Sequence, residues 1–528
     1  INWLWENTLD YNVNLGKDHT LAILAGYTAQ KQSNELKVIQ ANSFPDDQVQ
    51  TIGGGIVIGG TNIQEQWSLV SSLARVNYAF KEKYMVTGTM RSDRSSRFGA
   101  GHQTGTFPSI SLGWRIDDEP FMRKYDFINE FKLRTSYGLT GNFEIPNYGS
   151  IGLLSGANYV LSNTIVNGVG RSTLSNDMLS WESKKQLDIG LDYGFFKDRI
   201  YGEFDYYRSV TSDLLLNVTI PSSSGFSTAL TNIGEVENKG YEFTISTKNL
   251  IGKNFQWSTD FNISSNRNKV LKLGPSGDPI LSVGSAGDIR HITRIGDPIG
   301  SYYGYQVVGI YQTMAQIAAA PVDLLVGTGV NGGARPGDIQ FKDVNGDGKI
   351  TTADRTTVGK YMPDYTYGIT NRFKYKNLDL VIFFQGVQGR QILNLTTRHL
   401  LNGEANFNSY AEYNNRWISV SQPGNGVIPR ADRNSSLHGN NMRPSSFQVE
   451  DGSYFRLRNA TLGYDVPLNK TSQKLRIYVS GNNLFTMTKY LGFNPEVQQQ
   501  STTSITPGED YGAYPISSTY MIGFNFTF

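Results

Sequence analysis

The sequence has no cysteine, no long hydrophobic run and no marked excess of either charge. Without cysteine, the chain has neither disulfide bonds nor a thiol nucleophile. Its 48 basic and 46 acidic residues give a formal net charge of +2, so nothing favours nucleic acid or another polyanion as a partner. No stretch approaches the roughly 18 consecutive apolar residues of a membrane-spanning helix. The chain is therefore either soluble, or it crosses a membrane as strands.

Aromatic residues are plentiful, and they fall in alternating patterns. The chain has 30 tyrosines, 27 phenylalanines and 7 tryptophans among its 528 residues. Around Leu187 the apolar side chains fall on one face of a strand, and acids and glycines fall on the other. The apolar face carries Leu187, Ile189, Leu191, Tyr193 and Phe195, and the other carries Asp188, Gly190, Asp192 and Gly194. A strand of this kind lies between water and an apolar medium.

The same alternation recurs along the whole chain. It predicts about fifteen strands, each near the 9–11 residues that a tilted membrane strand needs. Further alternating segments lie at 3–15, 21–27, 70–80, 84–90, 110–116, 131–139, 200–206, 241–245, 255–263, 367–375, 378–384 and 475–479. The phase of the pattern changes near Asn459, which predicts a β-bulge there.

The predicted connections alternate between short and long. The short ones are 16–18, 81–83, 117–129, 197–199, 249–253, 376–377 and 466–473. The long ones are 31–64, 94–104, 141–180, 214–235, 267–365, 390–452 and 490–518. Outer-membrane barrels have short periplasmic turns and long external loops, whereas a soluble sandwich has no reason to sort its loops in this way. The pattern predicts an all-β, transmembrane antiparallel β-barrel in the outer membrane of a Gram-negative bacterium.

The last residues form one more amphipathic strand. Its apolar positions are Tyr520, Ile522, Phe524, Phe526 and Phe528, and such a closing strand resembles the signal that barrel assembly machinery reads. Lipid offers no hydrogen bonds to an open sheet edge, and bacterial single-chain barrels have an even number of strands. Fifteen is odd, and the first residues already read as strand. We therefore expect further strands on the N-terminal side, outside this sequence.

Several segments resemble the SusC/RagA family of TonB-dependent outer-membrane transporters. They are Asn232–Glu242 (NIGEVENKGYE), Gly296–Tyr305 (GDPIGSYYGY), Gly337–Ile339 followed by Asp343–Asp354, Phe455–Tyr464 (FRLRNATLGY) and Tyr478–Phe485 (YVSGNNLF). The resemblance covers essentially the whole chain, residues 1–528, in the order of the family. It identifies the chain as the C-terminal barrel portion of such a transporter.

The resemblance implies a 22-stranded barrel with a plugged lumen, in which these strands are the eighth to the twenty-second. The plug domain and the TonB-contacting segment then lie outside this sequence. It also implies active import of oligosaccharides or oligopeptides, energised through TonB, beneath a hinged lid formed by a SusD-like surface lipoprotein. By the same analogy, loops 141–180 and 214–235 are candidates for contact with that lid. The two rival interpretations are a TonB-dependent siderophore or cobalamin receptor and a secreted glycan-binding or adhesive β protein.

Within the long extracellular loop 267–365, residues 343–354 match the twelve-residue calcium loop at its ligand positions and at Gly348. The expected ligands are Asp343, Asn345, Asp347, Lys349 through its backbone carbonyl, Thr351 through a water, and Asp354. Position 12 is Asp rather than Glu, which shortens the reach of a bidentate carboxylate. A glycine-rich turn without an ion is the alternative. Calcium here would be structural and would fix part of the loop.

No catalytic set is visible, so we expect no enzymatic activity. The five histidines (His19, His102, His291, His399 and His438) are scattered and lack partners at metal-ligand spacing. Gly53–Gly55 lacks the Lys-Ser/Thr of a phosphate loop. Arg91, Asp93 and Arg94 are either a solute site or part of an ordinary hydrated inner wall. The loop aromatics Tyr302, Tyr303, Tyr305, Tyr410 and Tyr413 suit either sugar stacking or packing between loops.

Overall fold

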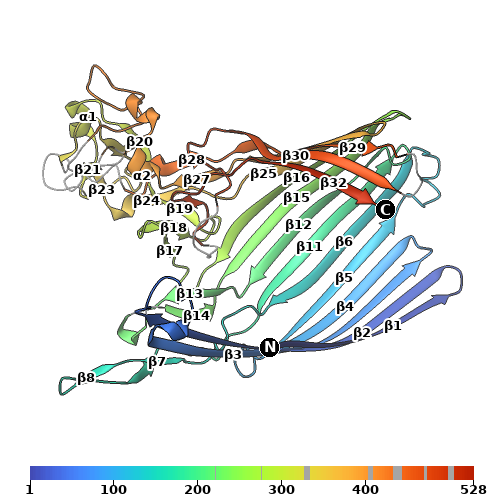
Figure 1. Ribbon diagram of the computed structural model, residues 1–528, viewed down its shortest axis with the longest axis horizontal. Coiled ribbons are helices and arrows are strands. Elements are labelled where there is room, and N and C mark those ends of the chain that lie inside the picture. The colour runs from blue at the N-terminus through green and yellow to red at the C-terminus, as the bar shows by residue number, and fades with distance from the viewer. Residues whose placement is uncertain are drawn as a thin grey trace. The chain divides into compact units, whose positions relative to one another are not determined.

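The computed structural model describes the chain except for residues 221, 227, 275, 326–332, 402, 404–407, 432–442, 469–472 and 498–504. Its main element is a 15-stranded sheet, which confirms the predicted number of strands (Figure 1). In sheet order the strands are β1 (Asn2–Leu15), β2 (His19–Asn42), β3 (Ile56–Phe80), β4 (Tyr84–Ser95), β5 (Thr104–Arg115), β6 (Ile128–Asn142), β11 (Glu182–Phe195), β12 (Ile200–Ser212), β15 (Glu235–Ile251), β16 (Phe255–Lys272), β25 (Tyr365–Tyr375), β26 (Leu378–Gln388), β29 (Tyr454–Val466), β30 (Lys474–Thr488) and β32 (Thr519–Thr527). Among the described helices, none combines the length and apolarity that a membrane crossing requires.

The chain divides into two compact units. Unit 1 comprises Ile1–Lys124, Phe131–Leu191 and Tyr207–Val236, and unit 2 comprises Tyr125–Glu130, Asp192–Tyr206 and Glu237–Phe528. The tightest predicted turns, such as 16–18 and 376–377, are found where expected. The predicted loop 267–365 begins later, at residue 273, because β16 continues to Lys272.

In unit 1 the strand register gathers apolar side chains on one face of the sheet. Tyr84 pairs with Phe80 on one side and with Trp114 on the other. Directly paired residues point to the same face, so the apolar positions form continuous rows across the strands. Val86 and Ile110, on this face, are exposed. An exposed apolar surface of this extent fits lipid better than water.

The sheet strands of unit 2 repeat the arrangement. Leu462 pairs with Leu380 and with Val479, and Val479 pairs in turn with Ile522. Polar side chains occupy the other face. We call the two sides the apolar face and the polar face of the sheet. In both units, the pairing of neighbouring strands therefore places the alternating apolar residues on one face of the sheet, as the sequence predicts.

The predicted loop 31–64 is wrong in its bounds. β2 and β3 stay paired as far as Asn42 and Ile56, so only residues 43–55 connect them. Strict alternation is needed only where a strand lies between water and lipid. Beyond that zone both faces meet water, and the ladder continues without the pattern that marked it in the sequence.

The predicted bulge lies in β29 at Arg458. Phe383 of β26 pairs with Asn459, whereas Phe384 pairs with Leu457, so Arg458 has no opposite residue on that strand. The register with β30 shifts at the same place. A bulge of this kind re-aims the side chains beside it.

Short strands and helices fill the long connections. In unit 1 they are β7 (Leu154–Gly156), β8 (Tyr159–Leu161), β9 (Thr164–Val166), β10 (Val169–Arg171), β13 (Leu215–Thr219) and β14 (Thr228–Asn232). A small core of Phe98, Phe107, Ile145 and Trp181 packs beneath two of these connections. The Trp181 indole N–H donates to the carbonyl of Gln103 at 3.0 Å, so the polar end of this buried ring is satisfied.

In unit 2 three long connections build one assembly with a core of its own. We call residues 273–364, 389–453 and 489–518 the loop assembly. Its described elements are β17 (Ile280–Val283), β18 (Ile289–Thr293), β19 (Ser301–Tyr305), β20 (Val307–Ile310), α1 (Met314–Ala319), β21 (Val322–Asp323), β22 (Ile339–Phe341), β23 (Lys349–Ile350), β24 (Arg355–Gly359), β27 (Gln391–Asn394), α2 (Thr397–Leu400), β28 (Val449–Asp451) and β31 (Glu509–Asp510). β27 pairs with both β28 and β31, which ties the second and third connections together.

Candidate functional site

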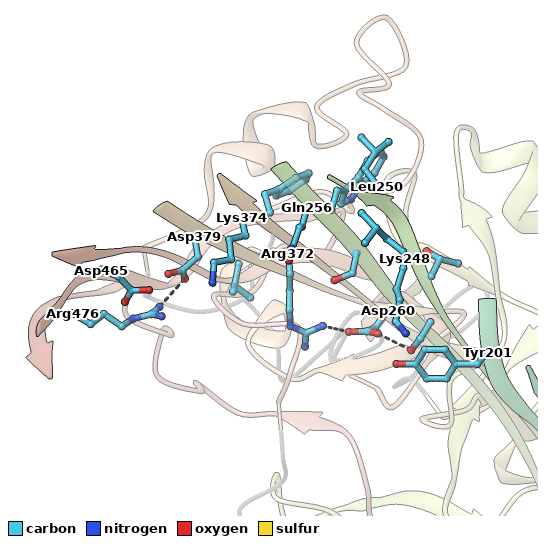
Figure 2. Close-up of a pocket in the computed structure, with 17 residues that line it drawn as sticks. Tyr201, Lys248, Leu250, Gln256, Asp260, Arg372, Lys374, Asp379, Asp465 and Arg476 are labelled. Carbon is cyan, nitrogen blue, oxygen red and sulfur yellow. Dashed lines mark hydrogen bonds and ion pairs between the residues drawn. The ribbon is translucent and has the colours of Figure 1, made fainter. Parts of the chain in front are cut away.

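The polar face of unit 2 holds an open cleft of about 610 Å³ near the short turns (Figure 2). Its charged and polar lining includes Tyr201, Ser246, Lys248, Asp260, Arg372, Lys374, Asp379, Asp465 and Arg476. The residues come from β12, β15, β16, β25, β26, β29 and β30. Alternation places them there, because each lies one position away from a residue of the apolar face.

Two ion pairs organise the cleft. Arg372 donates to the carboxylate of Asp260, which also accepts a hydrogen bond from Ser246 Oγ at 2.6 Å. Arg476 Nη2 lies 2.7 Å from Asp379 Oδ2. Both pairs join strands that are adjacent in the sheet or nearly so, and they leave hydrogen-bonding positions of the guanidinium groups open to solvent. Figure 2 shows the four side chains pointing into the same space.

The lining of the cleft consists largely of charged and hydrogen-bonding side chains. Its lining contains no histidine or cysteine, and the carboxylates of Asp260 and Asp379 are engaged by guanidinium groups. The arrangement suits reversible contact with a polar or charged segment.

The predicted calcium loop is present as a tight turn. Gly346 and Gly348 both have positive φ, at 76° and 80°. Asp343 accepts hydrogen bonds from the backbone N–H groups of these two glycines, at 2.6 and 2.7 Å. Asp354 closes the loop by accepting from the N–H groups of Val344 and Thr351, at 2.9 and 2.7 Å.

The other predicted ligands lie in the same turn. Asn345 Nδ2 donates to Asp347, and Asp347 accepts from the backbone N–H of Lys349 at 2.8 Å. Burial raises the pKa of Asp354, but hydrogen bonds from backbone N–H groups outweigh it and hold the pKa below its ordinary value. Among the described residues, no three His, Asp or Glu side chains are gathered closely enough to hold a metal. The donor types fit calcium, and the carboxylates would have to turn toward one another to bind it.

The structure brings Arg91 and Asp93 together but places Arg94 apart from them. Arg91 Nε lies 2.8 Å from Asp93 Oδ1 on the polar face. Arg94 pairs with Val70, a residue of the apolar face, and its guanidinium donates to Gln103 Oε1. Successive strand residues point to opposite faces, so Arg94 cannot share a site with its two neighbours.

The loop aromatics are in part a packing core. Tyr302 is fully buried at 0% exposure, and its hydroxyl lies 3.0 Å from the carbonyls of both Gln391 and Gly508. Tyr305 is buried against Phe341. Packing between loops therefore accounts for these two tyrosines. Tyr303, Tyr410 and Tyr413 are half-buried.

Sequence reasoning missed a buried polar pair in the loop assembly. His291 Nε2 lies 2.8 Å from Glu509 Oε1, and both side chains are fully buried. Burial raises the pKa of Glu509, but hydrogen bonds from His291 and from Ser285 hold it below its ordinary value. The two residues are more than two hundred positions apart, so no local pattern could have paired them. His438 lies outside the described residues.

A comparison with protein families decides the identity of the chain. The family model described as "TonB dependent receptor-like, beta-barrel" matches residues 1–484. The chain belongs to this TonB-dependent receptor family. Proteins of the family reside in the outer membrane and are not enzymes, so the predicted location and the expected lack of enzymatic activity are confirmed.

Individual relatives agree with this assignment. TonB-dependent receptor P3 of Formosa agariphila is 40% identical over 545 residues, covering 100% of this chain and 52% of that protein. SusC of Bacteroides thetaiotaomicron is 30% identical over 479 residues, covering 87% of this chain and 44% of SusC. The predicted membership of the SusC/RagA group is confirmed.

The fold agrees as well. The solved structure of the RagAB peptide transporter matches this TonB-dependent receptor with a TM-score of 0.83 at 24% identity, covering 100% of this chain and 55% of that one. The β-barrel fold class is thereby confirmed. The chain spans about half the length of the relatives that it matches.

Proposed function

We propose that the receptor containing this chain imports oligosaccharides or oligopeptides across the outer membrane. The observation that carries the proposal is the match to SusC and to the fold of the RagAB peptide transporter over nearly the whole chain. A sheet with one apolar and one polar face supports it, because such a sheet can separate lipid from an aqueous route. In this proposal TonB supplies the energy, and the description of the matching family, which names TonB, supports it.

A SusD-like lipoprotein is the partner that fits the loops of unit 1. Residues 153–172 form a two-stranded arm, here called the apolar arm, from the β7–β10 and β8–β9 ladders. Its exposed side chains are Leu154, Tyr159, Val160, Leu161, Ile165, Val166 and Val169. No charged residue occurs between Glu144 and Arg171. Uncharged edge strands with exposed apolar side chains invite association, so a lid protein that covers them explains their composition.

Growth and uptake in the native host test the import function. A strain lacking the receptor gene is grown on defined glycans and defined peptides, and uptake is restored with the intact gene. We expect restored uptake of one of these two cargo classes, and loss of that uptake when TonB is disrupted. Uptake that persists without TonB would contradict the proposal, as would rescue by iron chelates or cobalamin alone.

Co-purification tests the partner. The double variant Val160→Asp, Ile165→Asp places two charges on the apolar arm, and we expect it to release a SusD-like lipoprotein of the same host that co-purifies with the unmodified receptor. Phe121→Asp, at an exposed position in the connection between β5 and β6, is the matched control and should retain it. Equal retention by both variants would remove the arm from the interface.

Calcium in the 343–354 turn is a separate proposal with a direct test. Its support is the spacing of the acids together with the two left-handed glycines. Terbium luminescence of the purified receptor should be quenched by calcium, and Asp343→Ala with Asp347→Ala should abolish the signal. Asp46→Ala, in another exposed loop, is the control. An unchanged signal in the double variant would exclude this turn as the site.

A further inference from the structure

Two arginines of β29, Arg456 and Arg458, lie beside the bulge on the polar face of unit 2. Arg456 belongs to that face by alternation, and so does Arg458 two positions on, whereas an undisturbed strand would send Asn459 to the apolar face. Because the bulge leaves Arg458 without an opposite residue on β26, Asn459 lies on the polar face as well. Asn459 Nδ2 donates to Asn482 Oδ1 there at 2.8 Å.

Two arginines share a single carboxylate at this place. Arg456 Nη1 lies 2.5 Å from Glu496 Oε2, and Arg458 Nη1 lies 3.1 Å from the same oxygen. The Tyr454 hydroxyl donates to the other oxygen, Oε1, at 2.7 Å. Burial raises the pKa of Glu496, but the hydrogen bond from Tyr454 and the two guanidinium groups hold it below its ordinary value. One negative charge therefore faces two positive charges.

The two arginines differ in their exposure and in how many of their nitrogens donate hydrogen bonds. Arg456 is 2% exposed and donates from all three nitrogens, to Thr486 Oγ1, Glu496 Oε2 and Asn494 Oδ1. Arg458 is 40% exposed, and its bonds to described residues, to Glu496 and to Asn483 Oδ1, both come from Nη1. The edge formed by Nε and Nη2 therefore has no hydrogen-bond partner among the described residues.

Among the described residues, Glu496 is the one acid that bonds Arg458. Residues 498–504, which follow Glu496 closely in the sequence, read QQQSTTS and contain no charge. A further cation is close instead, because Arg390 Nη1 donates to the carbonyl of Pro495 at 3.1 Å. The site keeps a surplus of positive charge on a hydrated surface, and a planar guanidinium edge matches a carboxylate through two parallel hydrogen bonds.

We propose that Arg458 binds a carboxylate of the imported cargo through its Nε–Nη2 edge, with Glu496 fixing the orientation of the guanidinium group. The inference rests on the proposed import function and adds to it that the cargo is acidic. Two sources share this chemistry: the free C-terminus of an oligopeptide, and the uronic acid of an oligosaccharide. Asn459 and Thr461 supply neutral hydrogen-bonding groups beside Arg458 on the same face.

A competition experiment with matched probes tests the proposal. The receptor is purified in detergent and equilibrated with a pool of random hexapeptides, each present as the free acid and as the C-terminal amide. A second pool contains oligogalacturonates and their methyl esters. The retained probes are quantified by mass spectrometry. We expect the acid form to be enriched over the neutral form by about tenfold or more in one pool, as one charge-assisted hydrogen-bonded pair would give.

Substitutions at position 458 test whether Arg458 causes the preference for the acid form of the probe. Arg458→Gln should bring the ratio of acid to neutral form close to one. Arg458→Lys keeps the positive charge but loses the planar edge with two parallel donors, so it should keep part of the preference for the acid form. Arg75→Gln removes an equal charge from an exposed position on the polar face of unit 1 and should leave the ratio unchanged. Heat-modifiable migration on gels verifies that each variant is folded.

The outcomes separate this inference from the import function. Retention of neutral and acidic probes in equal amounts by the unmodified receptor, or an unchanged preference in Arg458→Gln, would overturn the carboxylate site and leave the transporter assignment intact. Retention of no probe of either pool would count against both. The pool that shows the enrichment identifies the source of the carboxylate.

Discussion

The apolar side chains of unit 2 are exposed on the sheet but buried in the loop assembly. In the sheet, residues such as Leu462 and Ile477 project from the apolar face and are exposed. In the loop assembly, Ile339, Ile350 and Ile392 are buried in small cores of their own. A polypeptide in water must fold over its apolar groups, whereas one in lipid need not. The same chain thus follows two sets of rules, because its two regions are adapted to different solvents.

The largest effect is expected in the core of the loop assembly. Tyr302→Ala removes a fully buried ring whose hydroxyl lies 3.0 Å from carbonyls of two other segments. The cost should be about 3–5 kcal/mol, the range for deleting a large buried aromatic ring. Limited proteolysis of the folded receptor should cut the loop assembly while the sheet stays intact. Tyr303→Ala, at a half-buried position, is the control, and equal protection of both variants would contradict the assigned core.

An arginine substitution on the apolar face distinguishes a position in lipid from one in water. Ile189→Arg should destabilise the receptor by about 2–4 kcal/mol if it lies near mid-bilayer depth. Ile165→Arg, in the apolar arm, should change stability little, although Ile165 is 70% exposed and Ile189 only 42%. Unfolding in urea from lipid vesicles measures both. Equal costs would show that the two isoleucines face the same medium.

The pair His291–Glu509 makes the stability of the loop assembly depend on pH in the acidic range. Because its folded-state pKa is lowered, Glu509 contributes stability that is present above its unfolded value of about 4.3 and is lost as pH falls through the lower folded value. Protease resistance of the loop assembly should therefore fall in this acidic range. Glu509→Gln should flatten that dependence and lower stability at neutral pH by about 1–3 kcal/mol. An unaltered profile in the variant would assign the acid sensitivity elsewhere.

The smallest effect is expected in the cleft. A Cβ at Gly463 would overlap the end of the flexible Arg476 side chain. Gly463→Ala should therefore shift the ion pair with Asp379 at a cost of about 1 kcal/mol or less. Gly88→Ala meets nothing within 4 Å and serves as the control. Chemical denaturation compares the two, and a large loss from Gly463→Ala would mean that the ion pair is more rigid than described.

Much of the sheet could be predicted from the sequence because its rule is local. Each strand carries its own alternation, and even the bulge at Arg458 changes the phase of that pattern. The paired extension of β2 and β3 could not be predicted, since polar and apolar residues mix once both faces meet water. The pairing ends at Asn42 and Ile56, beyond the alternating part of both strands.

The candidate sites depend on contacts that are distant in the sequence. Asp343 and Asp354 form a local motif and were found, but Glu496 meets Arg456 and Arg458 from a separate connection. Asp260 and Arg372 could not be recognised in the sequence, because nothing local distinguishes them from the other polar residues that alternate with apolar ones. Once the register is known, the same alternation shows which charged residues lie together on the polar face.

Solvent accessibility along β11 tests most directly whether the apolar face meets lipid. This chain has no cysteine, so single cysteines can be placed at 187 to 193 in turn and spin-labelled in the receptor embedded in lipid vesicles. Labels at Leu187, Ile189, Leu191 and Tyr193 should collide with oxygen dissolved in the bilayer, and labels at Asp188, Gly190 and Asp192 with a water-soluble nickel reagent. A period of two in both signals, in opposite phase, is the predicted result. Uniform accessibility to the aqueous reagent at all seven positions would contradict the account.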